Sequence, residues 1–125
     1  MKLDRFTMGG TIDKLYYHAK ITFEVGYPQI LEVLRVANLS IDYQVTPLMR
    51  KDSLELTDAD REKVRQAVQI STAKQVVITH GTDTMTDTAK ALAGISDKTI
   101  VLTGAMQPAR LRFTDAVCNI ARARQ

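Results

Sequence analysis

The chain has 125 residues, of which 45% are hydrophobic and 25% are charged, so it has the composition of an ordinary globular protein and not that of a disordered tail. This length allows one hydrophobic core, and we expect one domain over residues 1–125. The net charge of +3 is small, and four of the arginines that produce it, Arg110, Arg112, Arg122 and Arg124, lie close to the end of the chain. A solvated terminal helix explains them better than a nucleic-acid-binding surface, which usually interleaves basic and aromatic residues.

The single cysteine, Cys118, cannot form an internal disulfide. It lies near Ala116, Val117 and Ile120 in the sequence, so we expect it to pack as a small apolar residue in a reducing compartment. Asp4 and Arg5 interrupt the first residues, which argues against a signal peptide, and no segment has the apolar length of a membrane span. We therefore expect a cytoplasmic protein with no membrane partner.

The first half of the chain contains two predicted strands and one predicted helix. The opening segment up to Met8 is only weakly predicted as a strand, because Asp4 and Arg5 are charged where a central strand is usually apolar. A helix is expected to begin at Pro28, followed by apolar residues at helical spacing. The segment Ile41–Val45 alternates between apolar and polar residues, which is typical of a strand near the edge of a sheet.

The second half alternates helix and strand more clearly. Thr57–Asp60 resembles a capping box at the start of a helix. Two β-branched apolar segments, Gln75–Thr79 and Thr99–Thr103, are predicted to be buried strands. The helix between them is expected to end near Gly94, and a last helix is expected over Phe113–Ala123.

This alternation predicts an α/β fold with a doubly wound, flavodoxin-like or Rossmann-like, mostly parallel sheet and helices on both faces. No return strand follows the last helix, so we expect the sheet to be truncated at the C-terminus. Ligands of such sheets bind beyond the carboxyl ends of the strands. The loops after Met8, Val45, Thr79 and Thr103 are therefore the candidate site.

Two of these loops carry the most informative residues. Gly9-Gly10-Thr11 combines a sharp turn and close backbone approach with a hydroxyl group, but a simple turn would have the same composition. His80-Gly81-Thr82-Asp83-Thr84 follows the best predicted strand and places a hydroxyl beside a carboxylate, although Asp83 or Thr84 could equally serve as a helix cap. His80 itself is more typical of a structural residue at a strand end than of a catalyst.

Together the segments resemble the bacterial-type L-asparaginase family, in its amino-terminal domain. The matching segments are Gly9-Gly10-Thr11-Ile12, Asp52-Ser53, the run from Val77 to Met85, and Gly104-Ala105-Met106. Their order matches the family over essentially the whole chain, and short asparaginase-like proteins offer the nearest likeness.

The resemblance implies hydrolysis of the side-chain amide of L-asparagine, or of L-glutamine, to the acid and ammonia. It implies that Thr11 is the nucleophile, and that Thr82 and Asp83 are the second catalytic threonine and its neighbouring aspartate. Ser53, Thr82, Asp83 and the backbone of Ala105 would bind the amino-acid substrate. The resemblance implies no metal and no organic cofactor. It also implies that copies of the chain can form a homo-oligomer.

Two departures from the family pattern leave open whether the chain hydrolyses its substrate or only binds it. The family has a proton-relaying lysine downstream of the last matching motif, and Lys14, Lys90 and Lys98 do not match it. The residue aligned with the family tyrosine is Phe23, and either Tyr16 or Tyr17 could replace it. The alternative to an active amidohydrolase is therefore an inactive or weakly active amino-acid-binding or regulatory module.

Overall fold

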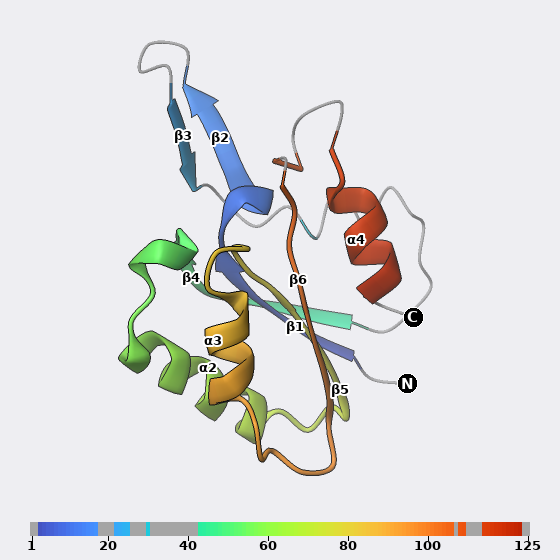
Figure 1. Ribbon diagram of the computed structural model, residues 1–125. Coiled ribbons are helices and arrows are strands. Elements are labelled where there is room, and N and C mark those ends of the chain that lie inside the picture. The colour runs from blue at the N-terminus through green and yellow to red at the C-terminus, as the bar shows by residue number, and fades with distance from the viewer. Residues whose placement is uncertain are drawn as a thin grey trace.

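The computed structural model describes residues 3–17, 22–25, 30, 43–106, 108–109 and 114–123. Its main sheet has four parallel strands in the order β4-β1-β5-β6 (Figure 1). The strands are β1 (Leu3–Gly9), β4 (Tyr43–Lys51), β5 (Gln75–Thr79) and β6 (Thr99–Thr103). The prediction of a parallel sheet is confirmed, and so are both of the strands predicted in the second half of the chain. Of these, β5 is buried as expected, whereas β6, the last strand in the order, is mostly half-buried.

Helices cover both faces of this sheet. The helices α2 (Asp58–Ile70) and α3 (Met85–Ala91) lie on one face, and α4 (Ala116–Ala123) lies on the other (Figure 1). The helix α2 begins at the predicted capping box, in which the Thr57 hydroxyl accepts from the Asp60 amide and the Asp60 carboxylate accepts from the Thr57 amide. Gly94 lies just beyond α3 with a φ of +85°, as a glycine after a helix commonly does. The doubly wound architecture is confirmed.

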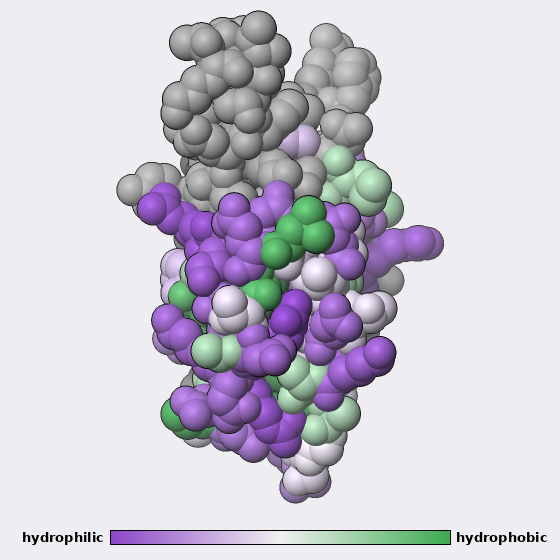
Figure 2. Space-filling model, turned by 60° about the vertical axis from the view of Figure 1, so that its left-hand side comes forward, coloured by the Kyte–Doolittle hydropathy of each residue, from purple (hydrophilic) through white to green (hydrophobic). Residues whose placement is uncertain are grey.

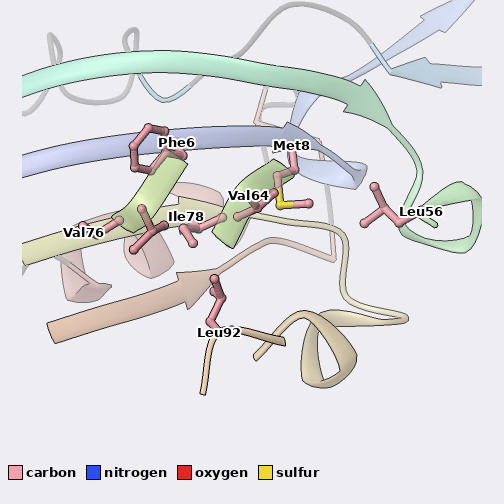
Figure 3. Packing of buried hydrophobic residues seen from close by; sticks show 8 residues of the cluster. Phe6, Met8, Leu56, Val64, Val76, Ile78 and Leu92 are labelled. Atoms are coloured by element: carbon pink, nitrogen blue, oxygen red, sulfur yellow. The ribbon is translucent and has the colours of Figure 1, made fainter. Parts of the chain in front are cut away.

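The larger apolar core lies between the sheet and the α2/α3 layer. Figure 3 shows strand side chains meeting helix side chains there. Phe6 and Met8 come from β1, Val76 and Ile78 from β5, Val64 and Val68 from α2, and Leu56 and Leu92 from the loops beside these elements. The outer surface on this side is mainly hydrophilic (Figure 2). The buried residues therefore recur at the spacing of a strand along β1 and β5 and at the spacing of a helix along α2.

The strand β1 corrects the expectation that its charges disfavour a central position. It pairs with β4 on one side and β5 on the other, and both Asp4 and Arg5 are buried. The Ser71 hydroxyl, just beyond α2, donates a hydrogen bond to the Asp4 carboxylate. A buried charge is tolerated where a polar group meets it, and Ser71 lies far from Asp4 in the sequence.

The strand β4 is longer than predicted. It lies at the edge of the sheet, as expected, but extends past Val45 to Lys51. Pro47 lies within it, which is tolerated because in the described sheet β4 has a neighbouring strand on one side only. The pairing with β1 shifts between Thr7 and Gly9. The polar residues that follow the strand therefore begin at Asp52.

A second sheet was not predicted. The strands β2 (Lys14–Tyr17) and β3 (Thr22–Val25) form an antiparallel hairpin, which follows the Gly-Gly turn and a short helical turn at residues 11–13. The helix expected from Pro28 lies outside the described residues, except for Ile30, which is helical and buried.

The last helix differs from the prediction in two ways. It begins at Ala116, after the non-helical Thr114 and Asp115, while Phe113 lies outside the described residues. Cys118 is exposed, so the expectation that it packs as an apolar residue is wrong. Ala116 and Ile120 take the inward positions of this helix instead. Within the described part of the chain, no helix has the length and apolar character needed to cross a membrane.

Candidate functional site

The strand order gives the sheet a switch point between β1 and β5. The chain leaves β1 towards β4 at one edge and later continues from β5 towards β6 at the other. In open parallel sheets the loops after two such central strands diverge and leave a crevice in which ligands bind. The loops in question are the Gly-Gly-Thr loop after β1 and the His-Gly-Thr-Asp-Thr loop after β5. Topology alone thus places the two predicted motifs next to each other.

The two loops touch backbone to backbone. Gly10 has a φ of +87°, and a Cβ atom at this position would lie 2.5 Å from the amide nitrogen of Gly81. The amide of Gly10 also donates to the carbonyl oxygen of Lys51 at 3.0 Å, which ties the end of β4 to the same turn. Both the left-handed conformation and the close approach require glycine.

Thr11 follows this turn and begins a short 3-10 helix, η1 (Thr11–Asp13). The Asp13 amide closes the turn onto the Gly10 carbonyl at 3.1 Å, and the Ile12 carbonyl accepts from the Ala109 amide at 2.9 Å. The backbone of Thr11 is therefore held at both ends, directly beside the contact between Gly10 and Gly81.

Ser53 lies against the loop after β5. It begins the 3-10 helix η2 (Ser53–Glu55), and its hydroxyl oxygen accepts from the Asp83 amide at 3.2 Å. The Thr84 hydroxyl in turn donates to the Ser53 carbonyl at 2.8 Å. Thr84 does occupy the N-cap position of α3, but its side chain makes no capping bond, because it bonds to Ser53 instead. A Cβ atom at Gly81 would lie 2.7 Å from the Ser53 hydroxyl oxygen, which again requires glycine.

The loop after β6 completes the cluster. A Cβ atom at Gly104 would collide with the carbonyl oxygen of His80 and would lie 3.5 Å from the Thr82 methyl group. Ala105, next along the chain, is buried, whereas Thr82 and Asp83 are exposed. The structure therefore gathers Ser53, Thr82, Asp83 and the Gly104-Ala105 backbone at one end of the sheet, beside the backbone of Thr11.

Two residues that hold this loop were missed by sequence reasoning. The Asp115 carboxylate accepts from the Met106 amide at 3.1 and 2.9 Å, and the Asn119 side-chain amide donates to the Gly104 carbonyl at 2.8 Å. Asn119 also donates to Asp115 at 3.1 Å. An aspartate just before a helix is typical of a helix cap, so the sequence could have indicated Asp115 as a cap. It did not indicate that Asp115 would bind the Met106 amide.

His80 is fully buried below the loop after β5. One ring nitrogen, Nδ1, lies 2.5 Å from the Gly81 carbonyl oxygen, and the other, Nε2, lies 2.7 Å from the Thr88 hydroxyl oxygen. Burial lowers the pKa of His80 below its ordinary value, and the nearby Arg61 guanidinium lowers it further, although the bond to the Gly81 carbonyl acts in the opposite direction. A neutral ring at neutral pH follows.

The described residues contain no cluster of three or more histidine, cysteine, aspartate or glutamate side chains able to hold a metal ion. A small hollow lies at the opposite end of the sheet, where Leu3, Gln75 and Thr99 begin their strands near Ala123. It is separate from the candidate site, and its lining offers no reactive group.

Comparison with known proteins gives a consistent result. The family model described as "Asparaginase, N-terminal" matches residues 4–125. The chain is 32% identical over 129 residues to Probable L-asparaginase 4 of Schizosaccharomyces pombe, covering 94% of this chain and 36% of that protein.

Two solved structures have the same fold. The thermostable L-asparaginase from Thermococcus kodakarensis matches with a TM-score of 0.80 and 27% identity, over 98% of this chain and 39% of that one. The probable cytoplasmic L-asparaginase from Campylobacter jejuni matches with a TM-score of 0.73 and 29% identity, over 98% and 38%. The chain thus spans less than two fifths of the length of these relatives.

Proposed function

The chain belongs to the asparaginase family, and from this membership we propose that it hydrolyses the side-chain amide of L-asparagine, or of L-glutamine, to the acid and ammonia. The observation that supports the proposal best is the interlocking of the loops at the carboxyl ends of the strands. Gly10 contacts Gly81, and Ser53 bonds to Asp83, so groups distant in sequence share one crevice.

Substrate binding is assigned to the polar groups around Ser53. The exposed Asp83 carboxylate offers a partner for the α-ammonium group of an amino acid. The Ser53 hydroxyl accepts from the Asp83 amide, so its own proton remains available to a substrate carboxylate. The backbone of Ala105, fixed through Gly104 and Met106, offers the third contact, to the departing amide.

The chemistry is assigned to the two threonines. The Thr11 oxygen attacks the amide carbon and its proton passes to the leaving nitrogen. The carbon–nitrogen bond then breaks, which releases ammonia and leaves an acyl ester on Thr11. Water then adds to that ester and releases the acid and the threonine. The exposed Thr82, next to the Gly104 backbone, lies where it can assist at the reacting amide. In this proposal, a single domain over residues 1–125 supplies both the reacting threonines and the substrate-binding groups.

The strand register of the hairpin supports a choice between the two tyrosines that could replace the family tyrosine. Tyr16 is the register partner of Phe23 in the hairpin, whereas Tyr17 is the partner of Thr22. We therefore assign the replacement to Tyr16. A Tyr16→Phe variant should lower ammonia release more than Tyr17→Phe, and the opposite order would contradict the assignment.

Ammonia release from L-asparagine and L-glutamine by the full chain tests the proposal. The wild type should release ammonia, and Thr11→Val should reduce the rate on the order of 10²-fold or more, because the nucleophile is lost. Thr86→Val, an exposed threonine in α3, is the matched control and should leave the rate unchanged. Equal rates for wild type and Thr11→Val would reject Thr11 as nucleophile.

The second candidate function is amino-acid binding without turnover. The phenylalanine at position 23, where the family has a tyrosine, favours it. Aspartate or asparagine should then raise the melting temperature by binding the folded state, with no ammonia formed. Ammonia release that depends on Thr11 would exclude this alternative.

A further inference from the structure

The buried His80 has hydrogen-bonding partners that fix its proton. The Gly81 carbonyl, 2.5 Å from Nδ1, can only accept, so Nδ1 must carry the hydrogen. In a neutral ring Nε2 then has no hydrogen and accepts from the Thr88 hydroxyl at 2.7 Å. Burial favours this neutral ring by lowering the histidine pKa.

The chain of donors begins in another helix. The Arg61 side chain on α2 can only donate, and its Nε donates to the Thr88 hydroxyl oxygen at 3.2 Å. Thr88 on α3 is fully buried, so its one hydroxyl proton is directed to His80. A single direction of donation therefore runs from Arg61 through Thr88 and His80 to the carbonyl of Gly81, with no donor left unmatched.

The end of this chain lies at the candidate site. A peptide group is planar, so fixing the Gly81 carbonyl also fixes the amide nitrogen of Thr82. The next residue, Asp83, is held by a different set of contacts, because its amide donates to Ser53 and the neighbouring Thr84 hydroxyl donates to the Ser53 carbonyl. Thr82 and Asp83 are adjacent in sequence, yet separate elements position them.

We propose that His80, supported by Thr88 and Arg61, is a positioning residue that sets the direction of the Gly81–Thr82 peptide and thereby places Thr82 against the substrate amide. This inference rests on the proposed function, since it assigns Thr82 to the chemical step. The two sets of contacts then act on different parts of the reaction. The His80 chain acts on the rate of the chemical step, and the Ser53 contacts act on substrate binding.

Two substitutions of threonine by the isosteric valine separate these effects. Thr88→Val removes the donor to His80 and should lower kcat about tenfold while KM stays within about twofold, because a small misplacement of a reacting group costs rate. Thr84→Val removes the donor to the Ser53 carbonyl and should raise KM with little change in kcat. Thr88→Ser keeps the hydroxyl and should restore kcat. Equal effects of Thr88→Val on kcat and KM, or no rescue by serine, would overturn the proposal.

Arg61→Met provides a second route if Thr88→Val does not fold. It removes the first donor from a partly exposed position and should lower kcat in the same direction by a smaller factor. An unchanged kcat in a folded Arg61→Met protein would contradict the chain of donors.

A readout without turnover distinguishes failure of this inference from failure of the proposed function. Nitrogen NMR of the wild-type chain should show His80 protonated at Nδ1 and unprotonated at Nε2. The Thr82 amide resonance should shift in Thr88→Val and return in Thr88→Ser. A ring protonated at Nε2, or an unmoved Thr82 amide, overturns the positioning role even if ammonia is released. Absence of ammonia release with the expected NMR result overturns only the proposed function.

Discussion

The core beneath α2 and α3 and the loops at the carboxyl ends of the strands are held together by different interactions. In the core, side chains such as Val68 and Ile78 fill space, and each contributes in proportion to the apolar surface it buries. In the loops, Gly10 and Gly81 meet backbone to backbone, and single hydrogen bonds fix the neighbouring residues. The loss of one methyl group weakens the packing of the core by a limited amount. A backbone contact between two loops, in contrast, is lost entirely once the backbones are forced apart.

The largest expected effect comes from Gly10→Ala. Its φ of +87° and the 2.5 Å approach of the new Cβ to the Gly81 nitrogen combine strain with overpacking, and should cost about 3 kcal/mol of unfolding free energy. Gly94→Ala is the matched control, because its φ is +85° but the nearest atom would lie 4.0 Å away. It should cost only about 1–2 kcal/mol. Urea unfolding measures both, and equal losses would show that the loop contact adds nothing.

Truncation of a core side chain should give the next largest loss of stability, but it should leave the activity unchanged. Val68→Ala removes two methyl groups from a fully buried side chain and should cost about 2 kcal/mol. The rate of ammonia release per folded molecule should stay at the wild-type value, because Val68 packs in the apolar core and is not a member of the chain formed by Arg61, Thr88 and His80. A changed rate at full folding would break the division between core and loops.

The capping box of α2 gives a smaller effect that depends on pH. Asp60→Ala should cost about 1 kcal/mol near neutral pH. The hydrogen bond from Lys51, followed by that from Thr57, lowers the pKa of Asp60, so its stabilisation is present above the ordinary carboxyl pKa and is lost as pH falls through the lowered value. Unfolding at pH 7 and at strongly acidic pH should show the difference between the two proteins shrinking, and a constant difference would contradict this.

The smallest effect concerns one proton on His80. Its lowered pKa means that the unfolded chain binds a proton more readily than the folded protein. The free energy of unfolding should therefore fall as pH drops below the ordinary histidine value and level off below the lowered one. The wild type should show this decline as pH falls below the ordinary histidine pKa, and His80→Gln should show less of it. Equal pH slopes would mean that His80 titrates normally in the folded protein.

Local patterns were sufficient to predict much of the fold. The strands at Gln75–Thr79 and Thr99–Thr103 each have three consecutive apolar residues at their centre, and the capping box at Thr57 has its own short sequence signature. The central position of β1 could not be predicted, because Asp4 is buried against Ser71, which lies 67 positions away. The four-residue strands of the hairpin are too short to show a period.

The candidate site shows the same division. The two glycine-containing loops could be identified from the sequence, because glycine and threonine after a buried strand form a local pattern. The hydroxyl of Thr84 could not be assigned, since the N-cap position suggested a capping bond and the structure gives a bond to Ser53. Asn119 was missed because nothing near it in sequence indicates that it reaches Gly104.

The contact between Gly10 and Gly81 has a genetic consequence. A side chain that clashes with another side chain can usually be rescued by shortening the second one. The atoms that oppose Gly10 are the nitrogen and Cα of Gly81, and those that oppose Gly104 include the His80 carbonyl oxygen. No substitution removes a backbone atom. A screen for second-site suppressors of Gly10→Ala should therefore recover reversion to glycine and no compensating replacement at position 81.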